Sequence, residues 1–211
     1  MKKMLSISAA LMFAGAVSYA QTSESKTGGV HLGLRAGLNL SNMVNSDDAD
    51  VTTGSKIGLN AAVFVELPLA NVFSIQPELQ FSQKGFKASG TALGSAYEYK
   101  QTTNFIEVPL LAKIKPVPGF GIVVGPQFSF LASTSTKFTV NNASYESLVK
   151  QENDNLKKNI LGGVIGVEAG AKNFVASLRY NIDFQNNNGD GTSSTPRYKN
   201  QVIALGIGII F

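Results

Sequence analysis

The chain has 211 residues, of which 44% are hydrophobic and only 15% are charged, with 18 Lys and Arg against 14 Asp and Glu and no Cys. Soluble domains carry about 25% charged residues, so this chain is poor in charge, and its apolar content excludes a disordered chain. Beyond the N-terminal region no stretch approaches the ~20 consecutive apolar residues of a membrane-spanning helix. Disulfides and cysteine metal sites are excluded, and without a Lys/Arg run we expect no nucleic-acid partner.

Residues 1–20 have the three parts of a secretory signal peptide. Lys2 and Lys3 form the positive start, residues 4–17 are apolar or small, and Ser18 and Ala20 are the small residues that signal peptidase reads. We predict cleavage after Ala20, which leaves residues 21–211 as one mature domain. The alternative is an uncleaved N-terminal membrane anchor. The lack of Cys fits export through an oxidising periplasm.

Eight segments of the mature chain alternate apolar and polar residues. In the first of them, Leu32, Leu34 and Leu38 fall on one parity and Arg35 and Asn39 on the other. A period of two predicts a strand with one apolar and one polar face. The eight predicted strands cover residues 30–40, 56–67, 73–82, 106–115, 120–130, 161–171, 174–184 and 202–211.

The connections between these strands alternate in length. Long polar connections are predicted at about 41–55, 86–96, 134–158 and 186–200, and short turns at 68–71, 115–119 and 171–173. An even number of antiparallel strands with short turns at one end and long loops at the other is the pattern of a transmembrane β-barrel, whose short turns are periplasmic. The sequence therefore predicts an all-β fold, an eight-stranded antiparallel up-and-down transmembrane β-barrel in the bacterial outer membrane.

A soluble eight-stranded barrel with an apolar cavity is the alternative. The membrane barrel is favoured because the polar parity is mostly Gly, Ser, Asn, Gln and Ala, too poor in charge for a solvent-exposed face. Four phenylalanines also fall on the apolar parity at the short-turn end, and the chain stops on one of them. We predict that they form a membrane girdle: Phe73, Phe120, Phe174 and Phe211.

Three prolines, Pro77, Pro109 and Pro126, lie inside predicted strands that have neighbours on both sides. Proline has no N–H for the hydrogen-bond ladder. We expect bulges or broken ladder bonds at these positions.

The chain resembles the Bacteroidetes-type outer-membrane β-barrel family described as PorT-like. The resemblance is carried by GLRAGLNLSN at 33–42, QPELQFSQKG at 76–85, EVPLLAK at 107–113, GPQFSFL at 125–131, RYN at 179–181 and the terminal Phe211, and the three prolines belong to the same pattern. It implies an outer-membrane location and an eight-stranded barrel. It implies little about activity, since only a few members are linked to protein secretion.

Charged residues on the polar parity are predicted to line the lumen in layers: Arg35, Glu78 and Arg179 at mid-depth, Glu66, Lys113 and Glu168 nearer the periplasm, and Lys56, Lys84, Glu107 and Asp183 toward the outside. Buried ions need partners of opposite charge. Because an eight-stranded barrel is only wide enough for its own side chains, we interpret the layers as a structural plug, with Gly206 and Gly208 making room for Arg35. The alternative interpretation is an ion path or a proton-coupled site.

Evidence for an enzyme or a metal site is weak. The sole histidine, His31, is predicted at the periplasmic end, away from the outer leaflet that a lipid hydrolase would attack, and nothing singles out a Glu/Asp pair for general acid–base work. Asp47, Asp48 and Asp50 cluster in the first long loop and Asn186 opens a calcium-like run in the last, but Arg197 stands where the bidentate Glu of an EF-hand would be. We expect no catalytic residue, cofactor or metal, and we interpret the sequon at 142–144 as accidental.

The third long loop, 134–158, mixes aromatic, aliphatic and charged residues, and exposed loops on a rigid barrel are common sites of recognition. We expect a non-enzymatic scaffold that presents extracellular loops and supports protein secretion or envelope assembly. The alternative is a narrow solute or ion channel. The expected partners are outer-membrane lipid, the barrel-assembly machinery during insertion, and an envelope or secretion protein.

Overall fold

The computed structural model describes residues 29–45, 53–92, 95–140, 143–149, 156–187 and 198–211. The predicted signal peptide lies outside these residues. The described residues form nine strands that pair only in antiparallel fashion: β1 (His31–Asn45), β2 (Thr53–Ala70), β3 (Phe73–Ala92), β4 (Ser95–Val117), β5 (Phe120–Val140), β6 (Ala143–Val149), β7 (Asn159–Ala171), β8 (Phe174–Asp183) and β9 (Tyr198–Ile210).

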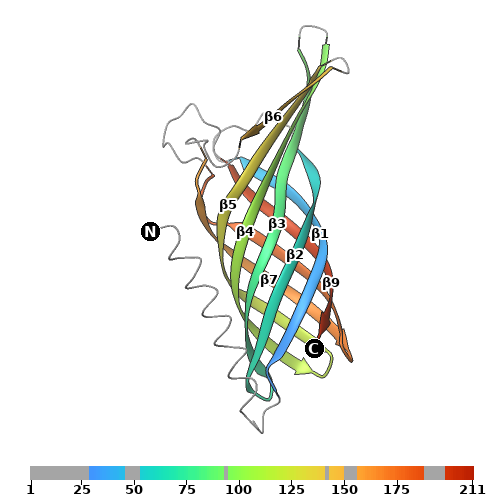
Figure 1. Cartoon of the computed structure of the whole chain (residues 1–211), viewed down its shortest axis with the longest axis vertical. Helices are drawn as coiled ribbons and strands as arrows, with labels where there is room; N and C mark the ends of the chain where they lie inside the picture. The colour runs from blue at the N-terminus through green and yellow to red at the C-terminus, as the bar shows by residue number, and fades with distance from the viewer. Residues whose placement is uncertain (1–28, 46–52, 93–94, 141–142, 150–155, 188–197) are drawn as a thin grey trace.

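Eight of the strands close into a ring (Figure 1). The order around it is β4, β3, β2, β1, β9, β8, β7 and β5, and β5 pairs back with β4. A closed ring gives each strand a hydrogen-bonding neighbour on both sides, which is what backbone in hydrocarbon requires. The predicted eight-stranded antiparallel up-and-down barrel is therefore confirmed. No helix in the described part of the chain is long and apolar enough to cross a membrane.

The apolar parity of each ring strand faces outward and the polar parity faces the lumen. On the apolar parity of β9, Ile207 is 74% exposed and Leu205 is 57% exposed. On the polar parity of β3 and β4, Glu78 and Glu107 are fully buried. The strands are thus apolar outside and polar inside, the arrangement of a barrel in lipid.

Three strands are much longer than the sequence predicted. β3, β4 and β5 have 20, 23 and 21 residues, about twice the ~9–11 that a transmembrane strand needs. The predicted loop at 86–96 was wrong, because Phe86–Ala92 pairs with Ser95–Gln101. This segment is rich in Gly, Ser, Thr and Ala, so it lacks the hydrophobic alternation that identifies a strand. Figure 1 shows the extended hairpin rising beyond the rest of the barrel, at the end opposite the short turns.

The third long connection, predicted as a loop over 134–158, is also partly a hairpin. β5 continues to Val140, and β6 returns alongside it with Val149 opposite Thr134. β6 is therefore a ninth strand, and the sequence did not predict it. It pairs with β5 and is not one of the eight ring strands. Residues 150–155 of this connection lie outside the described residues.

The three strand prolines do not produce the bulges expected at them. The register stays constant through all three positions, although the pairing skips two residues beside Pro77 in β3 and beside Pro109 in β4 before it resumes. Register shifts occur elsewhere, for example between Ser55 and Asn60 in β2. The gap between β3 and β4 includes Pro109, and the gap between β4 and β5 includes Pro126. The broken-ladder expectation therefore holds at all three prolines, because a missing N–H interrupts pairing locally without inserting a residue.

Candidate functional site

Glu78, a β3 residue at the centre of the lumen, lies between two arginines. Its carboxylate accepts hydrogen bonds from Nη1 and Nη2 of Arg179, both at 2.8 Å, and from Nη2 of Arg35 at 2.6 Å. The side chains of all three residues are less than 5% exposed. The bidentate contact with Arg179 is the strong geometry for a guanidinium and a carboxylate, and it leaves no unpaired charge in this part of the lumen.

The strand order shows that this cluster crosses the barrel. β3 and β8, which carry Glu78 and Arg179, are four places apart in the ring of eight and are therefore on opposite walls. Arg35, on β1, lies between them along the wall. Their direct contact means that side chains fill the lumen at this height.

A second layer lies nearer the short turns. The Lys113 ammonium is 2.8 Å from Oε2 of Glu66 and 2.8 Å from Oε2 of Glu168. Oε1 of Glu168 is in turn 2.5 Å from Nη2 of Arg179, so this layer and the central one form a single network. Lys115 also pairs with Glu66, at 2.6 Å, a contact that the sequence analysis missed although Lys115 shares the inward parity of Lys113.

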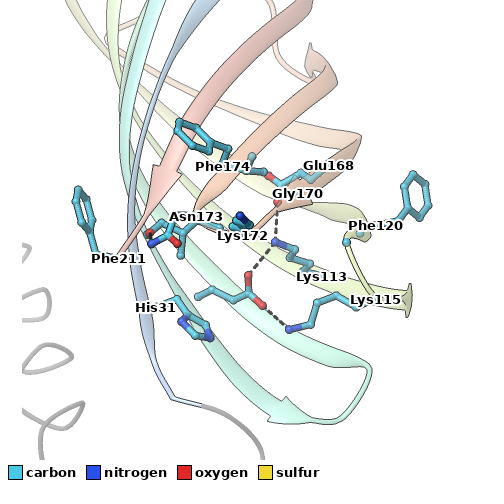
Figure 2. A pocket seen from close by; sticks show the side chains of 15 residues that line it. His31, Lys113, Lys115, Phe120, Glu168, Gly170, Lys172, Asn173, Phe174 and Phe211 are labelled. Atoms are coloured by element: carbon cyan, nitrogen blue, oxygen red, sulfur yellow. Dashed lines mark hydrogen bonds and ion pairs between the residues drawn. The ribbon is translucent and has the colours of Figure 1, made fainter.

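Beyond this layer the barrel opens into a pocket of about 510 Å³ at the short-turn end (Figure 2). Lys113 and Lys115 reach into the pocket, and His31 and Lys172 line it. Among the described residues that line it, none is Ser, Thr or Cys. Among its described lining residues, this pocket therefore offers no hydroxyl or thiol nucleophile for a histidine base to activate.

The outer layer is centred on Lys84, which is buried. Its ammonium is 2.9 Å from Oε1 of Glu107 and 3.1 Å from Oδ1 of Asp183. Asn200 donates a hydrogen bond of 2.6 Å to Oδ2 of Asp183, and Ser129 donates one of 3.0 Å to Glu107. Lys84 is on β3 and Asp183 on β8, so this layer also joins opposite walls.

Neutral amides connect the layers, and the sequence analysis did not select them. Gln80 donates to Glu107 at 3.0 Å and accepts from Arg35 at 3.2 Å, which joins the outer and central layers. Gln76 donates to Glu78 at 2.8 Å. Both glutamines were on the predicted inward parity, but a search for charges alone passes over them. With the amides and Ser129 included, all eight ring strands contribute to the buried polar network.

Glycines make room for the long cations. A Cβ added at Gly206 would lie 2.8 Å from Cδ of Arg35, and one added at Gly121 would lie 2.9 Å from Cε of Lys113. Any larger residue would displace these stems. Gly206 thus provides the expected space for the Arg35 side chain. At Gly208, an added Cβ would first meet the backbone oxygen of Leu34 and not the Arg35 side chain.

The four phenylalanines expected in the girdle lie at the short-turn end, three at the first residue of β3, β5 and β8 and one just after β9. Phe120, Phe174 and Phe211 are 37%, 67% and 66% exposed, Phe73 is half-buried, and Figure 2 shows the three labelled rings pointing away from the lumen. Outward-facing phenylalanines therefore lie at one end of the apolar surface, where the girdle is predicted.

One inward cation, Lys56, forms no ion pair with any residue that the structure describes. The loop aspartates at 47, 48 and 50, the Asn-rich stretch beyond Asn187, and Arg197 lie outside the described residues. Within the described ranges, no group of three His, Cys, Asp or Glu side chains is placed to hold a metal ion.

A closed antiparallel ring with an apolar exterior and an ion-paired interior defines a transmembrane β-barrel. The comparison with family models agrees: the chain belongs to the outer membrane protein beta-barrel domain family, whose model matches residues 19–188.

Solved structures with similarity to the chain include those of three bacterial proteins. They are Ail, the attachment invasion locus protein of Yersinia pestis (TM-score 0.46, 15% identity, 86% of this chain and 98% of that chain), Neisserial surface protein A (0.47, 10%, 87% and 100%) and OprG from Pseudomonas aeruginosa (0.42, 10%, 86% and 95%). No curated protein matches the chain by sequence.

Proposed function

We propose that this protein is a non-enzymatic scaffold of the outer membrane, exported by its N-terminal signal peptide and of the PorT-like kind, whose closed barrel presents long outer hairpins to an envelope or secretion protein. The observation that carries the proposal is the lumen network, which joins opposite walls at two heights beneath the extension of β3, β4 and β5. The motifs at 33–42, 76–85, 107–113 and 125–131 support the PorT-like assignment.

The ion pairs favour a closed barrel over the alternative of a channel. Conduction would require Glu78 to release Arg35 or Arg179, and breaking a buried pair leaves an uncompensated charge at a cost of about 3–5 kcal/mol. The three side chains instead hold one another in a fixed geometry. The network therefore supports a mechanical role, in which it fixes the spacing of the strands that carry the hairpins.

The outer extension is the surface that a partner would meet. β3 and β4 pair from Phe86 and Gln101 to their tip, and β5 and β6 continue the same sheet. Preformed strands lose less conformational entropy on binding than flexible loops do. Outer-membrane lipid and, during insertion, the barrel-assembly machinery are the other partners of the proposed scaffold.

Conductance measurement tests the closed lumen. We expect the folded protein, reconstituted in planar bilayers, to give no steady single-channel current. The variant Arg35→Ala/Glu78→Ala/Arg179→Ala, which removes the central cluster, should give detectable current if it remains folded. Reproducible open-channel steps from the wild-type protein would establish the channel and overturn the scaffold.

Affinity capture from intact envelopes tests the platform. One variant joins Thr134 to Val149 through Asn-Gly, a two-residue turn suited to hairpins, and so removes the β5–β6 hairpin. Its matched control joins Lys87 to Lys100 in the same way and trims only the β3–β4 tip. A partner that is captured by the wild-type protein and lost from one trimmed variant supports the proposal. Lipid turnover by the wild-type protein that disappears in His31→Ala would show an enzyme instead.

A further inference from the structure

A lysine at the short-turn mouth of the lumen has hydrogen-bond donors to spare. Lys113 meets three acceptors, which are Glu66, Glu168 and Gln76, at 2.8, 2.8 and 3.4 Å, so the three N–H donors of its ammonium are used. The ammonium of Lys115 meets one acceptor among the described residues, Oε1 of Glu66 at 2.6 Å. Its side chain is 32% exposed and reaches into the pocket (Figure 2). Lys115 can therefore donate hydrogen bonds to a ligand there.

The ion-pair network at this end has more positive than negative charge. Ion pairs join four cations to three carboxylates: Arg35, Arg179, Lys113 and Lys115 to Glu66, Glu78 and Glu168. Lys172, which lines the same pocket, is a fifth cation and forms no ion pair with a described residue. Even with a terminal carboxylate at Phe211 counted as a fourth negative charge, one positive charge remains. The excess carboxylate of the outer layer, beside Lys84, lies beyond the central cluster. A ligand with one negative charge would balance this end of the lumen.

Lys172 holds a strained backbone conformation at the mouth of this pocket. It is in the two-residue turn between β7 and β8, and its φ of 54° is in the left-handed region. A residue with a Cβ rarely adopts that region, and glycine or asparagine does so with less strain. Strained residues of this kind are concentrated at functional sites. The lysine at this position therefore supports, independently of the charge count, a role for its side chain in the pocket.

Part of the pocket lining is apolar. Val175 and Ile210, on the inward parity of β8 and β9, line the pocket, and Val175 is buried. Glycines at 119, 121 and 170 also line it and contribute no side chain to fill it. The volume of about 510 Å³ is within the range of roughly 300–1,000 Å³ that is typical of small-ligand pockets. A carboxylate attached to an apolar group therefore matches both the lysines and the apolar lining.

We propose that the short-turn pocket binds the C-terminal carboxylate of a periplasmic peptide chain. Lys115 and Lys172 pair with the carboxylate, and Val175 and Ile210 contact the last side chain of the peptide. The end of a chain is slim enough to enter an eight-stranded barrel, whose interior has room for little more than side chains. The site is at the opposite end of the barrel from the outer hairpins, so it does not depend on the scaffold function.

Residues 21–28 of the chain precede the pocket-lining His31 and are the other candidate occupant. They contain one acidic residue, Glu24, and one basic residue, Lys26. Cleavage after Ala20 would add a positive α-amino group, so this segment brings no net negative charge to the pocket. The charge balance therefore favours an incoming carboxylate.

The test is a titration of the purified mature protein in a zwitterionic detergent, followed by fluorine NMR of the ligand. The probe is the tripeptide trifluoroacetyl-Ala-Ala-Val, with the same tripeptide amidated at its C-terminus as the comparison ligand. Lys115→Gln and Lys172→Gln each remove one charge, and the double variant removes both. Lys199→Gln, a lysine on β9 at the opposite end of the barrel, is the matched control. Heat-modifiable gel migration checks that each variant is folded.

A hydrogen bond to a charged group contributes about 10-fold in affinity and an exposed ion pair about 3-fold. We therefore expect the free peptide to bind Lys115→Gln about 10-fold, Lys172→Gln about 3-fold and the double variant about 30-fold more weakly than the wild type. Lys199→Gln should bind like the wild type, which should bind the amidated peptide about 30-fold more weakly than the free one.

Three results would overturn the site: no binding of the free peptide by the wild type, equal binding of both peptides, or equal binding by the wild type and the folded double variant. Competition by an equimolar amount of acetate would overturn the peptide assignment, because it would show a site for any small anion.

Lys172→Gly separates a binding role from a structural one. Glycine relieves the backbone strain, so unheated samples of this variant should keep their folded gel mobility to a higher temperature than the wild type does. Its binding of the free peptide should nevertheless be about 3-fold weaker, as in Lys172→Gln. Binding as tight as that of the wild type would remove Lys172 from the site.

Glu24→Gln tests the chain's own segment as the occupant. We expect this variant to bind the free peptide like the wild type. Binding that is several-fold tighter than that of the wild type would assign the pocket to residues 21–28 and contradict the proposed external ligand.

Discussion

Glu78 is the residue on which the central charge balance depends. It pairs with both Arg35 and Arg179, and Glu168, which also pairs with Lys113, supplies a second negative charge to Arg179. Sharing of this kind couples the residues, so that the loss of one carboxylate leaves two guanidinium groups with too few partners. The free energy of the folded barrel should therefore respond far more to Glu78 than to an exposed glutamate.

We expect Glu78→Gln to lower the free energy of unfolding by about 3–5 kcal/mol, because the amide keeps the shape of the side chain and removes its charge. The measurement is the urea midpoint of the folded form in detergent, followed by gel mobility of unheated samples. Glu98→Gln, at an exposed position, is the control and should change stability by less than about 0.5 kcal/mol. Equal midpoints for the two variants would show that the central pairs do not stabilise the barrel.

The extended β3–β4 hairpin is anchored at its base by an aromatic cluster. Phe86 is 7% exposed, and its ring centroid is 5.3 Å from that of Tyr198 on β9 and 5.9 Å from that of Tyr99 on β4. Tyr198 therefore connects the protruding sheet to β9, which is three places away from β3 around the ring. Farther out, Tyr97 and Phe138 are 6.1 Å apart, but Phe138 is 40% exposed.

Phe86→Ala should loosen the hairpin without unfolding the barrel, because the ion-paired layers lie below it. Trypsin should cleave the variant after Lys87 or Lys100 at least about 10-fold faster than the wild type, which corresponds to about 1.4 kcal/mol of local opening. Phe138→Ala is the control and should change the cleavage rate little. Unchanged cleavage in Phe86→Ala would show that the aromatic cluster does not hold the hairpin.

At the scale of the whole molecule, the apolar exterior and the polar interior suit a chain whose surroundings are lipid. The folded form should resist detergent until it is heated, because the closed ring leaves no strand edge at which unfolding can begin.

We expect the cellular protein to fractionate with the outer membrane and to migrate differently on a denaturing gel before and after boiling. Its intact mass should correspond to a chain that begins at Gln21, since cleavage is predicted after Ala20. Recovery in the soluble periplasmic fraction would contradict the membrane assignment, and an intact mass that includes residues 1–20 would contradict the cleavage site alone.

Strand positions and faces could be predicted from the sequence because the period of two is a local property. Leu205 and Ile207 face outward, and Arg35, Glu78 and Arg179 face inward, as their parity indicates. The pairing of Glu78 with Arg179 could not be derived in the same way, since the two residues are 101 positions apart and meet only because β3 and β8 are opposite in the closed ring.

The sequence by itself therefore determined the barrel, the number of its strands, its apolar exterior and the polar residues that fill it. Tertiary structure alone decided which cations have carboxylate partners: Lys84 has two, whereas Lys56, on the same inward parity, has none among the described residues. It also decided that residues 86–96 continue β3 and β4 instead of forming a loop. Both outcomes depend on register and on neighbouring strands, which are non-local properties that hydrophobic periodicity along one segment does not contain.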